Sequence, residues 1–179
     1  HRARTALSHS SGSSAGRLRR RRRSGNHSRR FSSPSASNWT SPTSFSGSWQ
    51  SAYQGMLLDI RLMQNLASEA GLSYYIGMGQ VFESYIMMTL VDYFGDVPYS
   101  EALLGSDNLN PGIDSGQSIY NAVLALLDTA ISNFSAGGSG PEYDMYYGGD
   151  SSKWIKAANS IKKRAKGVNL YIKFKKFFS

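Results

Sequence analysis

Apolar side chains recur every three or four positions between residues 53 and 165, and this spacing constrains the fold more than any other feature. The first such set is Tyr53, Met56, Leu57, Ile60, Met63 and Ala67. A period of 3.6 residues places a set of this kind on one face of an α-helix. No alternating apolar and polar run of useful length, which a half-buried strand would need, interrupts the pattern. The spacing therefore predicts an all-α fold.

The pattern predicts four helices, which begin near Tyr53, Ser73, Ser115 and Ser151. Gly71 is expected to end the first, while Gly95 and Pro98 end the second. Asp114 or Ser115 is the expected N-cap of the third helix, and Asp150 or Ser151 that of the fourth. Short connections favour two antiparallel pairs, so the lengths fit helical hairpins of tetratricopeptide type, although no repeat signature is legible.

Charge divides the chain into three parts. Residues 1–30 carry ten arginines and no acid, residues 31–152 carry all twelve acids and one base, Arg61, and residues 153–179 carry nine bases and no acid. The overall net charge of +8 therefore conceals an acidic body between two basic ends. An acidic body argues against a broad surface for nucleic acid, so nucleic acid is an unlikely partner of the body.

The basic ends predict three segments. Residues 1–46 are rich in Ser and Arg and hold too few apolar residues to offset chain entropy, so we expect a disordered arm. This arm is open to three interpretations: a solvated linker, an arm for nucleic acid or another anionic surface, or translation in a shifted reading frame. Residues 47–166 form the helical part. Residues 167–179 are expected to be a poorly ordered basic and aromatic tail, either amphipathic at a membrane surface or out of frame.

Several kinds of chemistry are excluded. The chain has no cysteine, which rules out a disulfide scaffold, a thiolate zinc site and a thiol nucleophile. Its three histidines are His1, His9 and His27, so the helical part offers none for a Ser–His–acid triad. The oxygen-bearing residues between Asp107 and Asp114 do not have EF-hand spacing and are better interpreted as a polar turn. We predict no catalytic residue, no metal site and no cofactor.

Aromatic residues are the positive signal, since the chain has eleven tyrosines. Tyrosine offers a flat apolar face and a hydroxyl group at low entropic cost, which suits stacking on sugar rings or packing against a partner. Many of these residues belong to the core, and the spacing of Trp154 with Ala158 and Ile161 places its ring there. Tyr99 and Tyr143, which we expect to be exposed in loops, are the candidate ligand contacts.

Two segments carry a recognisable motif. Residues 90–103 read LVDYFGDVPYSEAL and end the second predicted helix, and residues 144–160 include DMYYGGD, KWIK and ANS in that order. The order and spacing of these motifs over residues 47–165 resemble the SusD/RagB family, and most closely its SusD-like nutrient-binding lipoproteins. The residues that carry the resemblance are Tyr93, Gly95, Asp96, Pro98, Asp150, Trp154 and Asn159.

We interpret these signature residues as scaffold. Gly95 can adopt a backbone geometry closed to other residues, Asp96 can bond the turn backbone, and Pro98 fixes the exit direction. Asp150 is expected to cap the helix that buries Trp154. We expect the side-chain amide of Asn159 to lie inside the packing, where it needs hydrogen-bond partners.

The resemblance implies a helical protein of tetratricopeptide type on the outer face of the outer membrane. It implies a non-catalytic protein that binds an oligosaccharide or another nutrient and passes it to a TonB-dependent, SusC-like transporter. Because family members are longer and carry a signal peptide and a lipid-bearing cysteine, we expect an internal fragment. Two alternatives stay open: a helical-repeat module for protein interaction, and an arginine-armed binder of nucleic acid.

Overall fold

The computed structural model describes residues 45–138 and 140–177, which belong to one compact unit of the chain. The helices in chain order are α1 Ser46–Gln50, η2 Ser51–Leu57, α2 Leu58–Glu69, α3 Ser73–Phe94, η3 Gly105–Asp107, α4 Gly116–Ser135 and α5 Ser151–Phe177. Strand-like pairing in the described part is limited to one bridge between Val97 and Asp114. The all-α prediction is confirmed. The predicted basic arm spans residues 1–46, of which residues 1–44 lie outside the described residues.

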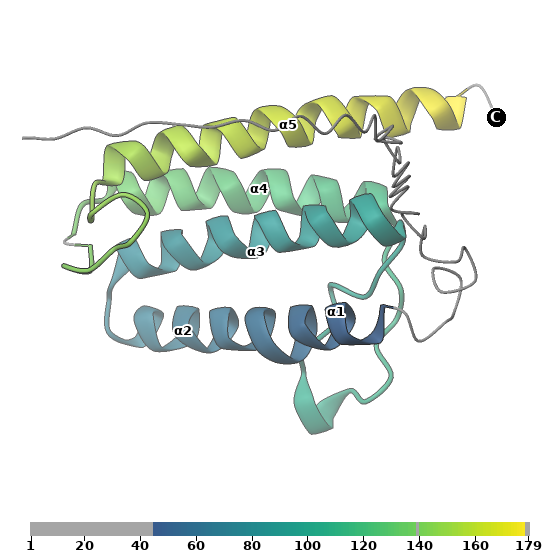
Figure 1. The fold of residues 1–179 in the computed structure, drawn as a ribbon, viewed down its shortest axis with the longest axis horizontal. Helices are drawn as coiled ribbons and strands as arrows, with labels where there is room; N and C mark the ends of the chain where they lie inside the picture. Colours follow the sequence, from purple (N-terminus) through teal and green to yellow (C-terminus); the bar gives the residue numbers. More distant parts are fainter. Residues whose placement is uncertain (1–44, 139, 178–179) are drawn as a thin grey trace, which may run out of the picture. The chain divides into compact units, whose positions relative to one another are not determined.

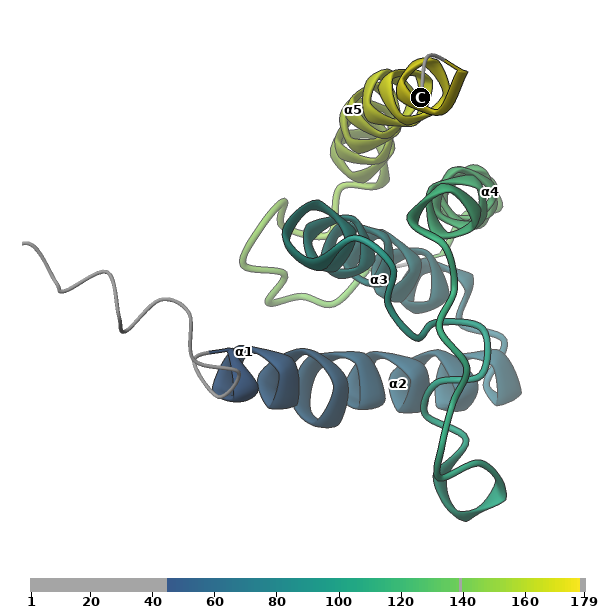
Figure 2. The same cartoon turned by 90° about the vertical axis from the view of Figure 1, so that its right-hand side faces the viewer.

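Successive helices pack against each other as antiparallel hairpins. α1, the π-helical segment η2 and α2 follow one another without a break, and the chain then reverses into α3 (Figure 1). α3 packs on both α2 and α4, and α4 packs on α5. Figure 2 shows α2 from the side and α3, α4 and α5 nearly end-on. From bottom to top of that view, the four helices follow one another in the order of the sequence. This arrangement confirms the predicted hairpins of tetratricopeptide type.

The predicted helix ends are confirmed in their chemistry. Gly95 has φ +77°, a left-handed conformation that is unfavourable for any residue with a Cβ atom. Its amide donates to the carbonyl of Val91 and so ends α3. Ser115 is the N-cap of α4, where its hydroxyl accepts from the amide of Ser118. Asp150 precedes α5, and its Oδ1 accepts from the amide of Ser152 at 2.8 Å.

Trp154 lies in the core, as its spacing predicts. Its side chain is 2% exposed and stacks on Phe134, while Phe82 and Tyr147 present ring edges to it. Ala158 and Ala165 follow on the same side of α5 and are fully buried. Figure 1 shows α5 along α4 over most of its length. The aromatic cluster therefore joins α3, α4 and the start of α5.

The structure corrects the prediction of a poorly ordered tail over residues 167–179. We expected regular helix to end before Gly167, but α5 continues to Phe177. A single glycine costs an α-helix only about 1 kcal/mol relative to alanine, which tertiary packing can offset. The offset is visible beyond Gly167, where Val168 and Ile172 pack against the core and Asn169 is buried.

The structure also corrects the prediction that the side-chain amide of Asn159 is buried. Its side chain is exposed, and its Nδ2 donates to the carbonyl of Ile155 one turn earlier in α5. Five residues separate it from Trp154, which turns it about 140° away from the buried side of the helix. The buried amide of α5 is instead that of Asn169, which donates to Asn121 at 3.0 Å and accepts from Gln117.

Polar contacts complete the attachment of α5. Arg164 pairs with Asp92 at 2.5 Å, and the same carboxylate accepts from the hydroxyl of Tyr120 on α4. Lys162 pairs with Asp128 of α4. The basic end of α5 therefore neutralises part of the acidic body within the molecule itself.

Candidate functional site

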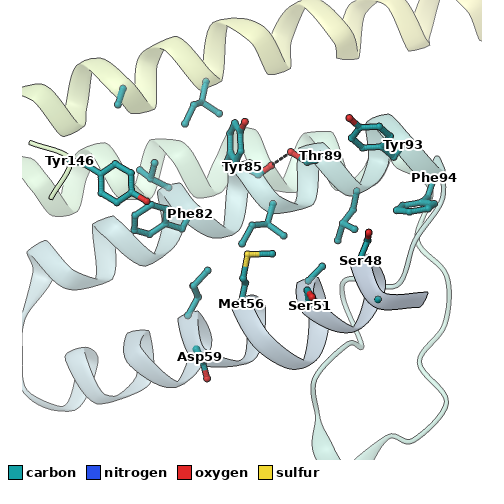
Figure 3. Close-up of a pocket in the computed structure, with 18 of the residues that line it drawn as sticks. Ser48, Ser51, Met56, Asp59, Phe82, Tyr85, Thr89, Tyr93, Phe94 and Tyr146 are labelled. Atoms are coloured by element: carbon teal, nitrogen blue, oxygen red, sulfur yellow. Dashed lines mark hydrogen bonds between the residues drawn. The ribbon is translucent and has the colours of Figure 1, made fainter. Parts of the chain in front are cut away.

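The described residues form an apolar groove of about 1250 Å³. Figure 3 shows α3 behind it, the α1–η2–α2 helix on one side and α5 on the other. Its lining is mainly apolar and includes Ile60, Val81, Leu90 and Trp154. We call this hollow the aromatic groove, since many aromatic residues line it, among them Phe82, Tyr85, Tyr93 and Tyr146.

Three tyrosine rings in the aromatic groove are open to solvent. Tyr85 is 53% exposed, Tyr93 77% and Tyr146 65%. Tyr85 and Tyr93 are eight residues apart on α3, a separation of roughly 12 Å along the helix axis. Tyr146 reaches the groove from the loop before α5, where its ring tilts against that of Phe82 (Figure 3). The groove thus presents a row of exposed rings along α3.

Polar groups in the aromatic groove are few. Ser48, Ser51, Asp59 and Thr89 contribute them, and the hydroxyl of Thr89 is committed to the carbonyl of Tyr85 at 2.8 Å (Figure 3). Within residues 45–138 and 140–177, the carboxylate of Asp59 and the hydroxyls of the three exposed tyrosines have no protein partner. The tyrosine hydroxyls can hydrogen-bond a ligand whose apolar face lies on the rings, whereas the carboxylate of Asp59 points away from α3 (Figure 3).

The loop that supplies Tyr146 is held by the buried carboxylate of Asp144, which is 9% exposed. The indole Nε1–H of Trp154 donates to Oδ2 at 2.7 Å, and the amide of Gly149 donates to the same oxygen at 3.1 Å. The amide of Tyr146 donates to Oδ1 at 2.9 Å. Burial raises the pKa of Asp144, but these hydrogen bonds outweigh burial and hold the pKa below its usual range. The charged carboxylate therefore fixes the path of the loop.

The two predicted contacts lie outside the aromatic groove. Tyr143 is 84% exposed, as expected, on the loop next to Tyr146. Tyr99, which we expected to be exposed, is half-buried, and the guanidinium of Arg61 lies 5.6 Å from the centre of its ring. Burial, followed by the carboxylate of Glu83, raises the pKa of Tyr99. The loop folds back on α2 and α3, and Tyr99 therefore packs against these helices although turn-forming residues flank it in the sequence.

A partly buried ion pair explains how this loop is anchored. Arg61 donates to the carbonyl of Ala102 at 2.6 Å and lies 3.3 Å from the carboxylate of Glu83, whose side chain is 7% exposed. Gln64 donates to the second oxygen of Glu83 at 2.9 Å. Arg61 is the one base between residues 31 and 152, and its charge is used inside the fold.

The signature residues have two kinds of role. Asp96 accepts from the amide of Gly116 at 2.8 Å, and the carbonyl of Pro98 accepts from the hydroxyl of Tyr53 at 2.6 Å, so both brace the loop as scaffold. Asp114 accepts from the amides of Tyr99 and Ser100, which makes the predicted polar turn a hydrogen-bonded one. Tyr93 differs from this pattern, since it lines the aromatic groove.

Sequence reasoning missed Tyr85 and Tyr146 as groove residues. The helical spacing of Tyr85 with Phe82 and Thr89 identifies one face of α3 but not the neighbour of that face. α3 is apolar nearly all round, which is typical of a helix with contacts on several sides. Ser84, Met87 and Val91 of α3 are buried in the core, and the face with Phe82 and Tyr85 lines the groove.

The described residues hold no group of three or more acids that could bind a metal ion. Among the helices described, none is long and apolar enough to cross a membrane.

Comparison with known proteins gives one family. A family model described as "Starch-binding associating with outer membrane", SusD-like, matches residues 26–166. A SusD/RagB family protein from Bacteroides thetaiotaomicron is 31% identical with a TM-score of 0.60, and the match covers 68% of this chain and 26% of that one. A SusD-like protein from the same organism is 27% identical with a TM-score of 0.61, over 70% and 26% of the two chains.

A chitin-binding SusD homologue from Flavobacterium johnsoniae shares the fold, with a TM-score of 0.56 at 24% identity over 65% of this chain and 25% of that chain. A search of curated proteins finds no match. The chain spans about a quarter of the length of these solved relatives. The family model, in contrast, matches most of the chain, and it runs through α1, α2, α3, α4 and the first half of α5. The chain therefore belongs to the SusD-like family that this model describes.

Proposed function

We propose that this chain is a non-catalytic, glycan-binding part of an outer-membrane nutrient-uptake protein, and that the aromatic groove contacts the glycan. One observation carries the proposal: a member of a starch-binding family exposes three tyrosine rings in one apolar groove. The C–H faces of a sugar ring suit such rings, and its hydroxyls can bond the free tyrosine hydroxyls.

The acids around the groove support binding without turnover. Canonical glycoside hydrolysis needs two carboxyl groups on either side of the scissile bond. Among the described residues that line the groove, Asp59 is the one acid, and the buried Glu83 is committed to Arg61 and Gln64. The described part of the groove therefore offers a sugar on the tyrosine row no such pair of carboxyl groups, and Asp59 itself points away from the row (Figure 3).

The proposed setting is the cell-surface side of the outer membrane, with a SusC-like, TonB-dependent transporter as partner. The family description, which names association with the outer membrane, supports the setting. Purified transporter should retain the full-length protein in a pull-down, and membrane fractionation of the native cells should recover it with the outer membrane. Recovery in another fraction would contradict this part of the proposal.

The glycan proposal is tested by isothermal titration of the full chain with malto-oligosaccharides and chito-oligosaccharides. Tyr85→Ala, Tyr93→Ala and Tyr146→Ala should each weaken binding by roughly threefold to tenfold, about 0.5–1.5 kcal/mol per ring. Tyr171→Ala removes a ring that is 67% exposed on α5, outside the groove, and serves as the matched control. Chromatography of the sugar after incubation should show no shortened product.

Tyr143→Ala forms a separate arm of the same titration. Its ring neighbours the groove without lining it, so we propose it as a secondary contact with a smaller effect than Tyr146→Ala. A larger effect would move the site onto the loop. Groove variants that bind sugars as tightly as the unchanged chain would refute the groove as the site.

A helical-repeat module for protein interaction is the second candidate, because the walls of the groove are mostly apolar. An amphipathic helix could place its apolar face there. In that case a bound polypeptide would resist excess oligosaccharide, and the tyrosine variants would weaken binding of the polypeptide alone.

A further inference from the structure

A second apolar surface lies on the outer side of α2, away from the core. Leu58, Leu62 and Leu66 follow one another at intervals of four residues and are 47%, 56% and 58% exposed. Leu62 and Leu66 also line a hollow of about 500 Å³ with Leu72 and Tyr75. A row of leucines open to solvent on a soluble helix is typical of a surface that another protein covers. We call this row, with its flanking acids, the leucine face.

The charges beside the leucine face are all negative. Asp59 and Glu69 flank the row and are exposed. The one base of α2, Arg61, is turned inward to Glu83 and the carbonyl of Ala102. A partner that covers the leucines therefore has to present apolar side chains together with positive charge.

The outer side of α5 has the complementary character. Lys163, Lys166, Leu170 and Tyr171 are exposed at positions that span roughly 140° of the helix circumference. Leu170 is 56% and Tyr171 67% exposed. Lys163 and Lys166 have no acidic partner within the described residues, unlike Lys162 and Arg164, which pair with Asp128 and Asp92. We call this surface the basic face.

One molecule cannot join its own two faces. α2 and α5 make no contact with each other in the described part of the chain, and both figures show α3 and α4 between them (Figures 1 and 2). We therefore propose that the basic face of one copy binds the leucine face of a second copy, head to tail. Contacts of this kind are heterologous, so they build rings or open chains, and each copy uses both faces. This inference is independent of the glycan proposal.

The test begins with sedimentation velocity of the full chain across a concentration series, at 50 mM and 500 mM salt. We expect assembly that grows with concentration and weakens in high salt, since the charges on both faces are exposed. Leu62→Glu with Leu66→Glu should abolish assembly, as should Lys163→Glu with Lys166→Glu. Leu104→Glu, at a loop leucine that is 49% exposed, is the matched control and should leave assembly unchanged.

Mixing the two monomeric double variants is the decisive step. One retains an intact basic face and the other an intact leucine face, so the mixture should form a dimer of one copy each and nothing larger. Circular dichroism checks that both variants keep their helices. A chain that stays monomeric at all concentrations, an assembly insensitive to the leucine variant, or a mixture that stays monomeric would each overturn the proposal. None of these outcomes bears on sugar binding.

Discussion

Replacing Asp144 with asparagine should destabilise the fold through the loop that carries Tyr146. The carboxylate accepts from Trp154 Nε1 at 2.7 Å and from the amides of Tyr146, Tyr147 and Gly149 at 2.9, 3.3 and 3.1 Å. An asparagine keeps one acceptor oxygen and turns an NH₂ group toward two of these donors. A donor left unsatisfied in a buried place costs about 1–3 kcal/mol.

The expected loss for Asp144→Asn is about 3 kcal/mol, which combines the unsatisfied indole N–H with the loss of charge from the remaining bonds. In a chain of this size, that loss lowers Tm by about 6–12 °C. Urea unfolding followed by tryptophan fluorescence and far-ultraviolet circular dichroism measures it. Glu142→Gln is the matched control, because Glu142 is exposed in the same loop.

The same variant should change the dependence of stability on pH. The hydrogen bonds hold the pKa of Asp144 below its usual range, so the stabilisation is complete above the unfolded pKa of about 3.9 and is lost as the pH falls through the folded pKa. The free energy of unfolding should therefore fall more steeply below about pH 4 in the unchanged chain than in Asp144→Asn. An asparagine variant that matches Glu142→Gln in stability would refute the reasoning.

Three further substitutions test other parts of the fold by urea unfolding. Gly140→Ala places a Cβ 2.5 Å from Tyr74 Cζ and 2.8 Å from Gly149 Cα, so it should cost about 1–3 kcal/mol; a neutral result would mean that the loop does not pack on Tyr74. Gly167→Ala meets nothing within 4 Å and should stabilise α5 by about 0.5–1 kcal/mol, whereas no gain would indicate that the helix ends earlier. Arg61→Met leaves the buried carboxylate of Glu83 without its ion pair and should cost about 3–5 kcal/mol, and Arg61→Met with Glu83→Gln should recover part of that loss if the pair is the cause.

The helices could be predicted because their causes are local. Apolar spacing identified α3 and α4 within a few residues of their observed ends, and Gly95, Ser115 and Asp150 marked three of the boundaries. Those signals act through hydrogen bonds and backbone angles within one or two turns, so no distant contact is needed to read them. The same holds for Trp154, whose spacing along α5 places it in the core.

Contacts between distant segments could not be predicted in the same way. Arg61 meets Glu83 and Ala102 across 22 and 41 residues, and this packing buries much of Tyr99 where a loop residue was expected to be open. Asn159 and Asn169 both lie on α5, and the rotation of the helix against α4 decides that the second amide is the buried one.

The sequence by itself therefore determined the helical class, the hairpin order, most helix ends and the resemblance to SusD-like proteins. The tertiary structure decided which side of each helix faces a neighbour, and with it the site. Period alone assigns Tyr85 and Phe82 to one face of α3, but only the positions of α2 and α5 make that face a groove. The physical reason is that burying an apolar helix face is favourable against any surface of matching shape. The local pattern therefore does not determine which neighbouring helix covers that face.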